Sequence, residues 1–165
     1  GSQLLTTRLE QQYPGIYEKA LDVLAVSNRI PPPSIVVKRE VYERLGGFDS
    51  RLHHAADWEM WVRIAAHFPL WYWPEPLALY RVHAGSDTSR LFQTGANMQN
   101  RREAIAIIRQ YLPRDRANSL TRKALAYSTV FGLRRALRAL RMGDLRVFRS
   151  QFRETLICAV QILRV

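Results

Sequence analysis

The chain has 165 residues, 47% of them hydrophobic and 24% charged, which is the composition of one globular domain or half of a larger one and excludes a disordered or collagen-like chain. A single cysteine excludes a disulfide framework and a Cys-rich zinc site, and no uncharged stretch of the C-terminal region reaches the roughly 20 apolar residues that cross a bilayer, so we expect an intracellular chain. The net charge of +11 lies entirely in residues 91–165, with 15 basic and 4 acidic side chains, and this asymmetry indicates an anionic partner such as nucleic acid or a membrane surface.

The N-terminal third is predicted to change from helix to strand. Residues 4–26 have helical spacing with a break at 13–15. Three prolines at 31–33 then force an extended backbone. The apolar, β-branched run Ser34–Val37 has the composition of a buried strand.

The middle of the chain predicts two helices. Residues 38–45 form a short helix that Gly46-Gly47 would end. A second helix runs from about Asp57 to His67, and Asp57 lies at or near its N-terminus. Trp58 and Trp61 share one face of this helix, a spacing that favours a core position for both.

Two short strands, residues 70–73 and 76–80, come before the helical C-terminal half. There we expect helices over 91–111, 115–142 and 145–163, the last two joined by a tight hairpin at Gly143-Asp144.

The last two expected helices are basic and amphipathic. Their apolar side chains recur at helical spacing, and arginines occupy much of the remaining circumference. The apolar set is Leu133, Leu137, Leu140, Phe148, Phe152, Leu156, Val160 and Leu163. These faces either pack on each other and on the rest of the chain, which we favour slightly, or lie on an anionic membrane surface.

General catalytic motifs are missing from the sequence: there is no P-loop, GxGxxG, GxSxG or HExxH. His53-His54-x-x-Asp57 could in principle bind a metal, but the spacing is not that of a closed metal site, and a solvated loop is the stronger interpretation.

Residues 30–89 carry a series of short motifs in a fixed order. A strand with basic residues after it (34–39) is followed by Gly-Gly-Phe-Asp (46–49), by an acidic helix start with Trp and Arg (57–63), and by Tyr-Arg-x-His (80–83). This order resembles the second half of the catalytic domain of family-2 glycosyltransferases, which have the GT-A fold.

The resemblance implies roles for individual residues. Asp57 corresponds to the general base of inverting members, which removes the proton of the acceptor hydroxyl. His83 corresponds to a ligand of a divalent metal, Mg or Mn, beside the donor diphosphate, and Arg81 would lie close to that diphosphate.

The remaining implied residues lie on the acceptor side. Gly46, Gly47 and Phe48 would shape the acceptor wall, and Asp49 would be structural or contact the acceptor. Trp58 is a candidate for sugar contact, although the core interpretation is favoured.

The sequence departs from the family pattern in two places. Where many members have Glu-Asp, this chain has Ala56-Asp57. More importantly, no Asp-x-Asp occurs, and too few residues precede Pro31 to build the nucleotide-binding half. Gly1-Ser2 also indicates a cloning remnant on a piece of a longer protein. We therefore expect no transferase activity from this chain alone, and the metal is expected in the complete enzyme.

Together these patterns predict a mostly α, α/β fragment: the acceptor-side part of a GT-A domain in residues 1–90 and a basic helical tail in 91–165. The expected function is inverting transfer from a nucleotide-diphosphate sugar to a hydroxyl of a glycan or lipid-linked acceptor, in the cytoplasm or peripherally at the inner membrane face.

Two alternatives are a nucleic-acid-binding module and a helical protein-docking module. Nucleic acid is disfavoured because the aromatic residues concentrate in 48–92 and the basic excess in 91–165, so the two do not interleave. The open edge of the strand expected at 34–37 would also favour a homodimer.

Overall fold

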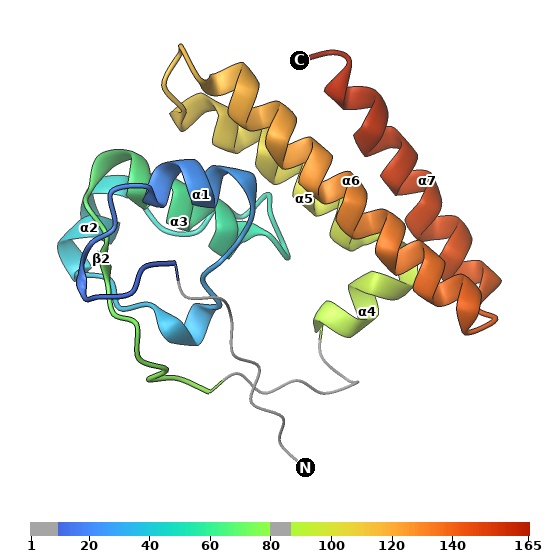
Figure 1. Ribbon diagram of the computed structural model, residues 1–165, viewed down its shortest axis with the longest axis horizontal. Helices are drawn as coiled ribbons and strands as arrows, with labels where there is room; N and C mark the ends of the chain where they lie inside the picture. Colours follow the sequence, from blue (N-terminus) through green and yellow to red (C-terminus); the bar gives the residue numbers. More distant parts are fainter. Residues whose placement is uncertain (1–9, 80–86) are drawn as a thin grey trace.

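The computed structural model describes residues 10–79 and 87–165, with the side chains of 87–89 left out, and this part of the chain is mostly helical (Figure 1). The helices are α1 Ala20–Val26, α2 Arg39–Leu45, α3 Ala56–His67, α4 Asp87–Thr94, α5 Ala96–Ile108, α6 Ala117–Arg141 and α7 Leu145–Ile162. Single 3₁₀ turns occur at Pro32–Ser34 and Arg109–Tyr111. The strands β1 Gly15–Ile16 and β2 Trp71–Tyr72 pair antiparallel.

Several predicted elements are confirmed. α2 ends as expected at Gly46, whose φ of 80° places it in the left-handed region and whose N–H donates to the carbonyl of Tyr42. α3 covers the expected helix, and α6 and α7 form the expected hairpin at Gly143-Asp144. Asp144 caps α7 by accepting a hydrogen bond from the N–H of Val147.

Other elements differ from the prediction. The expected strand Ser34–Val37 does not form, since residues 32–34 make a 3₁₀ turn and the extended residues after it pair with no described strand. The homodimer expected through the open edge of this strand is therefore no longer supported, because the strand does not form. The described part of the expected strand 76–80 is also irregular, and the helix expected over 91–111 is interrupted at Gly95, whose φ is 80°.

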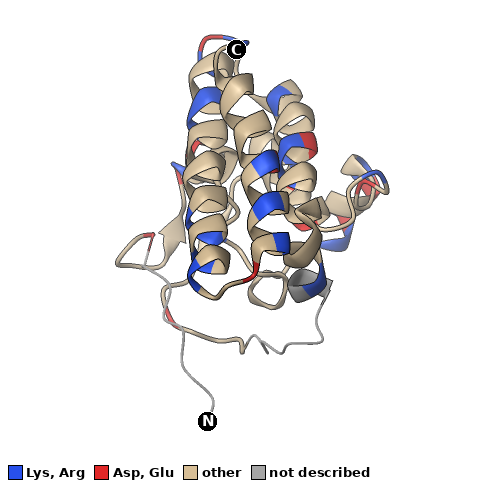
Figure 2. Ribbon diagram, turned by 90° about the vertical axis from the view of Figure 1, so that its right-hand side faces the viewer, with Lys and Arg blue, Asp and Glu red and all other residues tan. Residues whose placement is uncertain are grey.

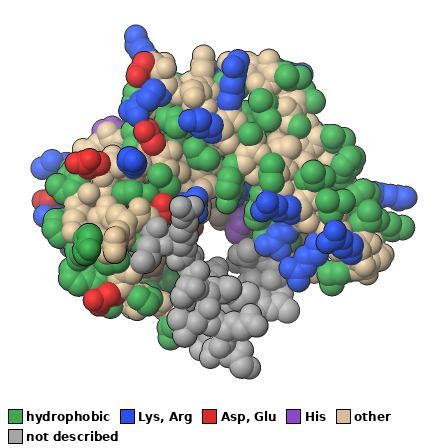
Figure 3. Space-filling view, viewed as in Figure 1, with side chains coloured by type: hydrophobic (Ala, Val, Ile, Leu, Met, Phe, Trp, Pro, Cys, Tyr) green, Lys and Arg blue, Asp and Glu red, His purple; other side chains and the backbone are tan. Residues whose placement is uncertain are grey.

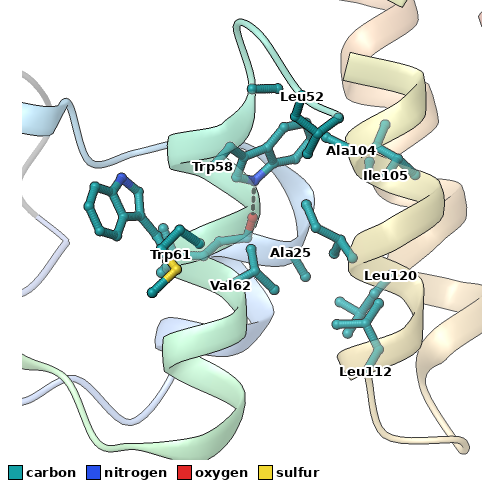
Figure 4. Packing of buried hydrophobic residues seen from close by; sticks show 14 of the residues in the cluster. Ala25, Leu52, Trp58, Trp61, Val62, Ala104, Ile105, Leu112 and Leu120 are labelled. Atoms are coloured by element: carbon teal, nitrogen blue, oxygen red, sulfur yellow. Dashed lines mark hydrogen bonds between the residues drawn. The ribbon is translucent and has the colours of Figure 1, made fainter. Parts of the chain in front are cut away.

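The core is shared between the two halves of the chain. α1 and α3 pack on α5 and α6, which run side by side in Figure 1. Figure 4 shows Trp58 of α3 facing Ala104 and Ile105 of α5, with Leu120 of α6 beside Ala25 of α1. One buried cluster thus continues across position 90, and the helices after it are packed parts of the fold.

The α6–α7 hairpin is joined through small residues. Gly132, Ala136 and Ala139 are buried on α6, and Thr155 and Cys158 are buried on α7. A Cβ at Gly132 would lie 2.3 Å from Thr155 Oγ1, so only glycine permits this close approach. The two helices pack on each other and on the core as expected, but not through the leucine stripe: Leu133, Leu137 and Leu140 lie outside this seam and are 40–43% exposed.

Candidate functional site

Asp57 lies in the first turn of α3, where the free N–H groups favour an anion. Its carboxylate accepts hydrogen bonds from Asn28 Nδ2 (3.0 Å) and from the N–H of Trp58 (2.7 Å). Burial raises the pKa of Asp57 above its ordinary value, and the two hydrogen bonds and the nearby His54 oppose this shift more weakly. Asp57 is therefore a stronger base than an exposed aspartate.

Two asparagines that the sequence analysis did not single out position the surroundings of Asp57. Asn28 holds the carboxylate with its amide nitrogen and accepts from the N–H of Ile30 with its oxygen. Asn100 of α5 accepts from the N–H of His54 (2.9 Å) and fixes the loop before α3. The sequence feature that could have identified Asn100 is a polar side chain among the buried positions of α5, where an apolar residue is the usual choice.

The turn at Gly46–Asp49 is fastened to α3 by Arg63. The guanidinium donates to the carbonyl of Leu45 (2.6 Å) and to the carbonyl of Gly47 (2.7 Å). It also pairs with Glu59, whose side chain is completely buried. The double-glycine turn is thus held in place by an ion pair inside α3.

The two remaining residues of this turn differ in availability. Phe48 is 53% exposed and packs edge-on against Trp61, with ring centroids 5.9 Å apart. The carboxylate of Asp49 is occupied by Arg51, which lowers its pKa to about 2. Phe48 is therefore open to a ligand, and Asp49 has a structural partner.

Trp58 and Trp61 are core residues, as their spacing predicts. They are 1% and 2% exposed, and their Nε1 atoms donate to the carbonyls of Leu24 and Ile30 respectively (Figure 4 shows the bond of Trp58). The guanidinium of Arg101 covers the Trp58 ring at 4.9 Å. Because the indole is enclosed, we no longer assign substrate contact to Trp58.

Arg81 and His83 lie outside the described residues, so their expected positions beside the metal and the donor diphosphate stay predictions. Within residues 10–79 and 87–165, no three His, Cys, Asp or Glu side chains gather as a metal site. The expected metal ligation therefore gains no support from the described residues.

A separate open hollow of about 350 Å³ lies between α1 and α6. Lys19, Arg29 and Lys123 line it, and Asp57 does not.

Comparison with known proteins gives no further assignment: no family model, no curated protein and no solved structure matches this chain.

Proposed function

We propose that this chain is the acceptor-side portion of an inverting, nucleotide-sugar-dependent glycosyltransferase, and that Asp57 is its general base. The observation that carries the proposal is the Asp57 carboxylate itself, which is partly buried, held by Asn28 and raised in pKa by that burial. Asp57 also occupies the position of the acidic residue in the ordered motifs that resemble a GT-A acceptor half. The proposal includes a cytoplasmic location.

In the proposed reaction, Asp57 takes the proton of an acceptor hydroxyl while that oxygen attacks the anomeric carbon of the donor sugar. The new bond joins the acceptor oxygen to the anomeric carbon, and the bond to the nucleotide diphosphate breaks with its electrons. Burial supports this role, because a carboxylate with a raised pKa holds the transferred proton better. Asn28 keeps the second oxygen of the carboxylate in place.

The acceptor would lie between Asp57 and Phe48. Asp57 and Trp61 are four residues apart and share one face of α3. Phe48 packs on Trp61, and about half of the Phe48 side chain stays exposed. Trp61 lies about one helical turn after Asp57, so the exposed Phe48 ring lies at a similar distance along α3 from the Asp57 carboxylate. An apolar ring beside a base suits the face of a sugar or the first carbons of a lipid alcohol.

The first test uses the chain as it stands. We expect it to show neither sugar transfer nor binding of nucleotide diphosphates such as UDP or GDP in calorimetry, because the donor half is missing. Donor binding in the micromolar range would contradict this expectation.

The second test uses the intact polypeptide that supplies a donor half. Asp57→Asn should lower kcat by about 10²–10⁴-fold and leave the donor KM unchanged. The matched control is Asp22→Asn, since Asp22 is a surface carboxylate paired with Arg116. Wild-type turnover by Asp57→Asn would exclude the general-base role.

A further inference from the structure

The α6–α7 hairpin carries an exposed apolar surface that no described segment covers. Its side chains are between 36% and 86% exposed, although all are large and hydrophobic. We call this set the hairpin face: Leu133, Leu137, Leu140, Phe152, Leu156, Val160 and Leu163.

The two helices turn these side chains to the same side. Phe131 of α6 contacts Phe92 of α4, and Glu154 of α7 pairs with Arg102 of α5. Two residues along a helix rotate the side chain by about 200°, so Leu133 and Leu156 point away from the α4–α5 layer. The small-residue seam lies between the two stripes, and the result is one continuous surface opposite α5 (Figure 3 shows apolar and basic side chains together over the hairpin).

The charge on this hairpin has one sign. Residues 117–165 contain ten Lys or Arg and two Asp or Glu. Both acids are occupied, because Asp144 caps α7 and Glu154 pairs with Arg102 on the opposite side. Figure 2 shows Lys and Arg positions at intervals along the ribbons of the long helices. The exposed arginines of this range are Arg122, Arg134, Arg138, Arg141, Arg146, Arg149, Arg153 and Arg164.

We propose that the hairpin face docks on an anionic lipid bilayer, with its leucines and phenylalanine at the boundary of headgroups and acyl chains and its arginines on the lipid phosphates. No helix of the described residues combines the length and apolar character needed to span a bilayer, so the hairpin would lie along the surface. This proposal rests on the hairpin alone and is independent of the proposed glycosyltransferase activity.

Charge and apolarity together favour a bilayer over the other occupants. A second copy of the hairpin would bring two strongly basic surfaces together. A nucleic acid would use the arginines and leave the leucines uncovered. An anionic bilayer matches both kinds of side chain in one surface.

The experiment is flotation of the purified chain with vesicles of phosphatidylcholine alone or of equal parts phosphatidylcholine and phosphatidylglycerol. We expect binding only to the anionic vesicles, weakened by added sodium chloride. Leu137→Gln/Leu156→Gln should weaken it by on the order of tenfold or more, through lost apolar burial. Leu77→Gln is the matched control, because Leu77 is 78% exposed and lies far from the hairpin in sequence.

A second pair of variants tests the charges. Arg149→Gln/Arg153→Gln should lower the affinity roughly fivefold for each charge removed, and Arg44→Gln on α2 should not change it. A Phe152→Trp reporter should shift its emission to the blue and be quenched by brominated lipids on binding. All variants are first checked for a wild-type circular dichroism spectrum and thermal unfolding.

Three results would overturn the proposal. The first is equal binding to neutral vesicles or none to anionic ones. The second is full retention of binding by Leu137→Gln/Leu156→Gln, which would mean that the arginines act alone, as they would on nucleic acid. The third is a dimer by light scattering that the same two substitutions dissociate, which would assign the face to a second copy.

Discussion

The guanidinium of Arg63 lies 2.9 Å from the carboxylate of Glu59, one turn earlier in α3, and the Glu59 side chain has no exposed surface. The same guanidinium holds the carbonyls of Leu45 and Gly47. A buried ion pair thereby fixes the glycine turn that the family resemblance places at the acceptor wall. Arg63 therefore has a structural role: it neutralises the buried charge of Glu59 and holds the backbone of the glycine turn.

Arg63→Met should lower the free energy of unfolding by about 3–5 kcal/mol, because it leaves the Glu59 carboxylate buried without its partner. Urea unfolding measures the difference. The double variant Glu59→Gln/Arg63→Met should recover part of the loss, and Arg44→Met on the exposed side of α2 should change little. A loss below about 1 kcal/mol for Arg63→Met would show that the Arg63–Glu59 pair contributes little to stability.

Gly132→Ala should destabilise the fold by about 1–3 kcal/mol or more, because the added methyl group would meet Thr155 Oγ1 at 2.3 Å and the Met98 methyl carbon at 2.8 Å. The matched control is Gly47→Ala, where no atom lies within 4 Å of the added methyl group and a change within about 0.5 kcal/mol is expected. Equal thermal unfolding of both variants would disprove the close α6–α7 contact.

The raised pKa of Asp57 should appear in the pH dependence of stability. In the folded chain the carboxyl holds its proton at a pH where the unfolded chain, near the ordinary value of 3.8, has lost it. The contribution of Asp57 to stability is therefore present below pH 3.8 and is lost as the pH rises through the folded pKa. The unfolding free energy of wild type minus that of Asp57→Asn should fall across this window. A flat difference would mean that the pKa is not raised.

Asn28→Ala should raise the pKa of Asp57 further, since it removes a hydrogen bond to the charged carboxylate. Carbon-13 NMR titration of the Asp57 carboxyl measures this directly. Asn118→Ala serves as the control, because Asn118 is exposed and contacts Arg109 instead. A lowered or unchanged pKa in Asn28→Ala would show that Asn28 does not stabilise the charged form.

Local signals in the sequence predicted α2, α3 and the α6–α7 hairpin, because glycine stops and helical apolar spacing act within a few residues. The extended backbone at Ile35 was also predicted, but not its lack of strand pairing. Ile35 and Val37 pack on the core while Val36 is fully exposed, so the alternation is that of a strand whose partner is absent from the described residues. Composition reports burial preference and carries no information on pairing.

The hairpin shows a second limit of sequence patterns. Apolar spacing located the leucine stripe of α6 correctly but assigned it to packing, whereas Gly132, Ala136 and Ala139 make the contact. Small residues let two helices approach closely, and this approach leaves the larger side chains outside. Likewise the motif proposes Asp57 as a site residue, a prediction that stays untested, while Asn28 and Asn100, which position its surroundings, come from distant segments that only folding brings together.

The pairing of β1 with β2 has a consequence for shortened versions of the chain. The N–H of Tyr17 donates to the carbonyl of Leu70, and the Tyr17 and Tyr72 rings lie against each other. A shortened chain whose first residue is Glu18 would lack β1 and leave the backbone edge of β2 unpaired. Trp71 and Trp73 at this edge are 67% and 50% exposed. Such a truncated protein should be recovered as aggregates, since a bare backbone edge flanked by two indoles would join neighbouring molecules.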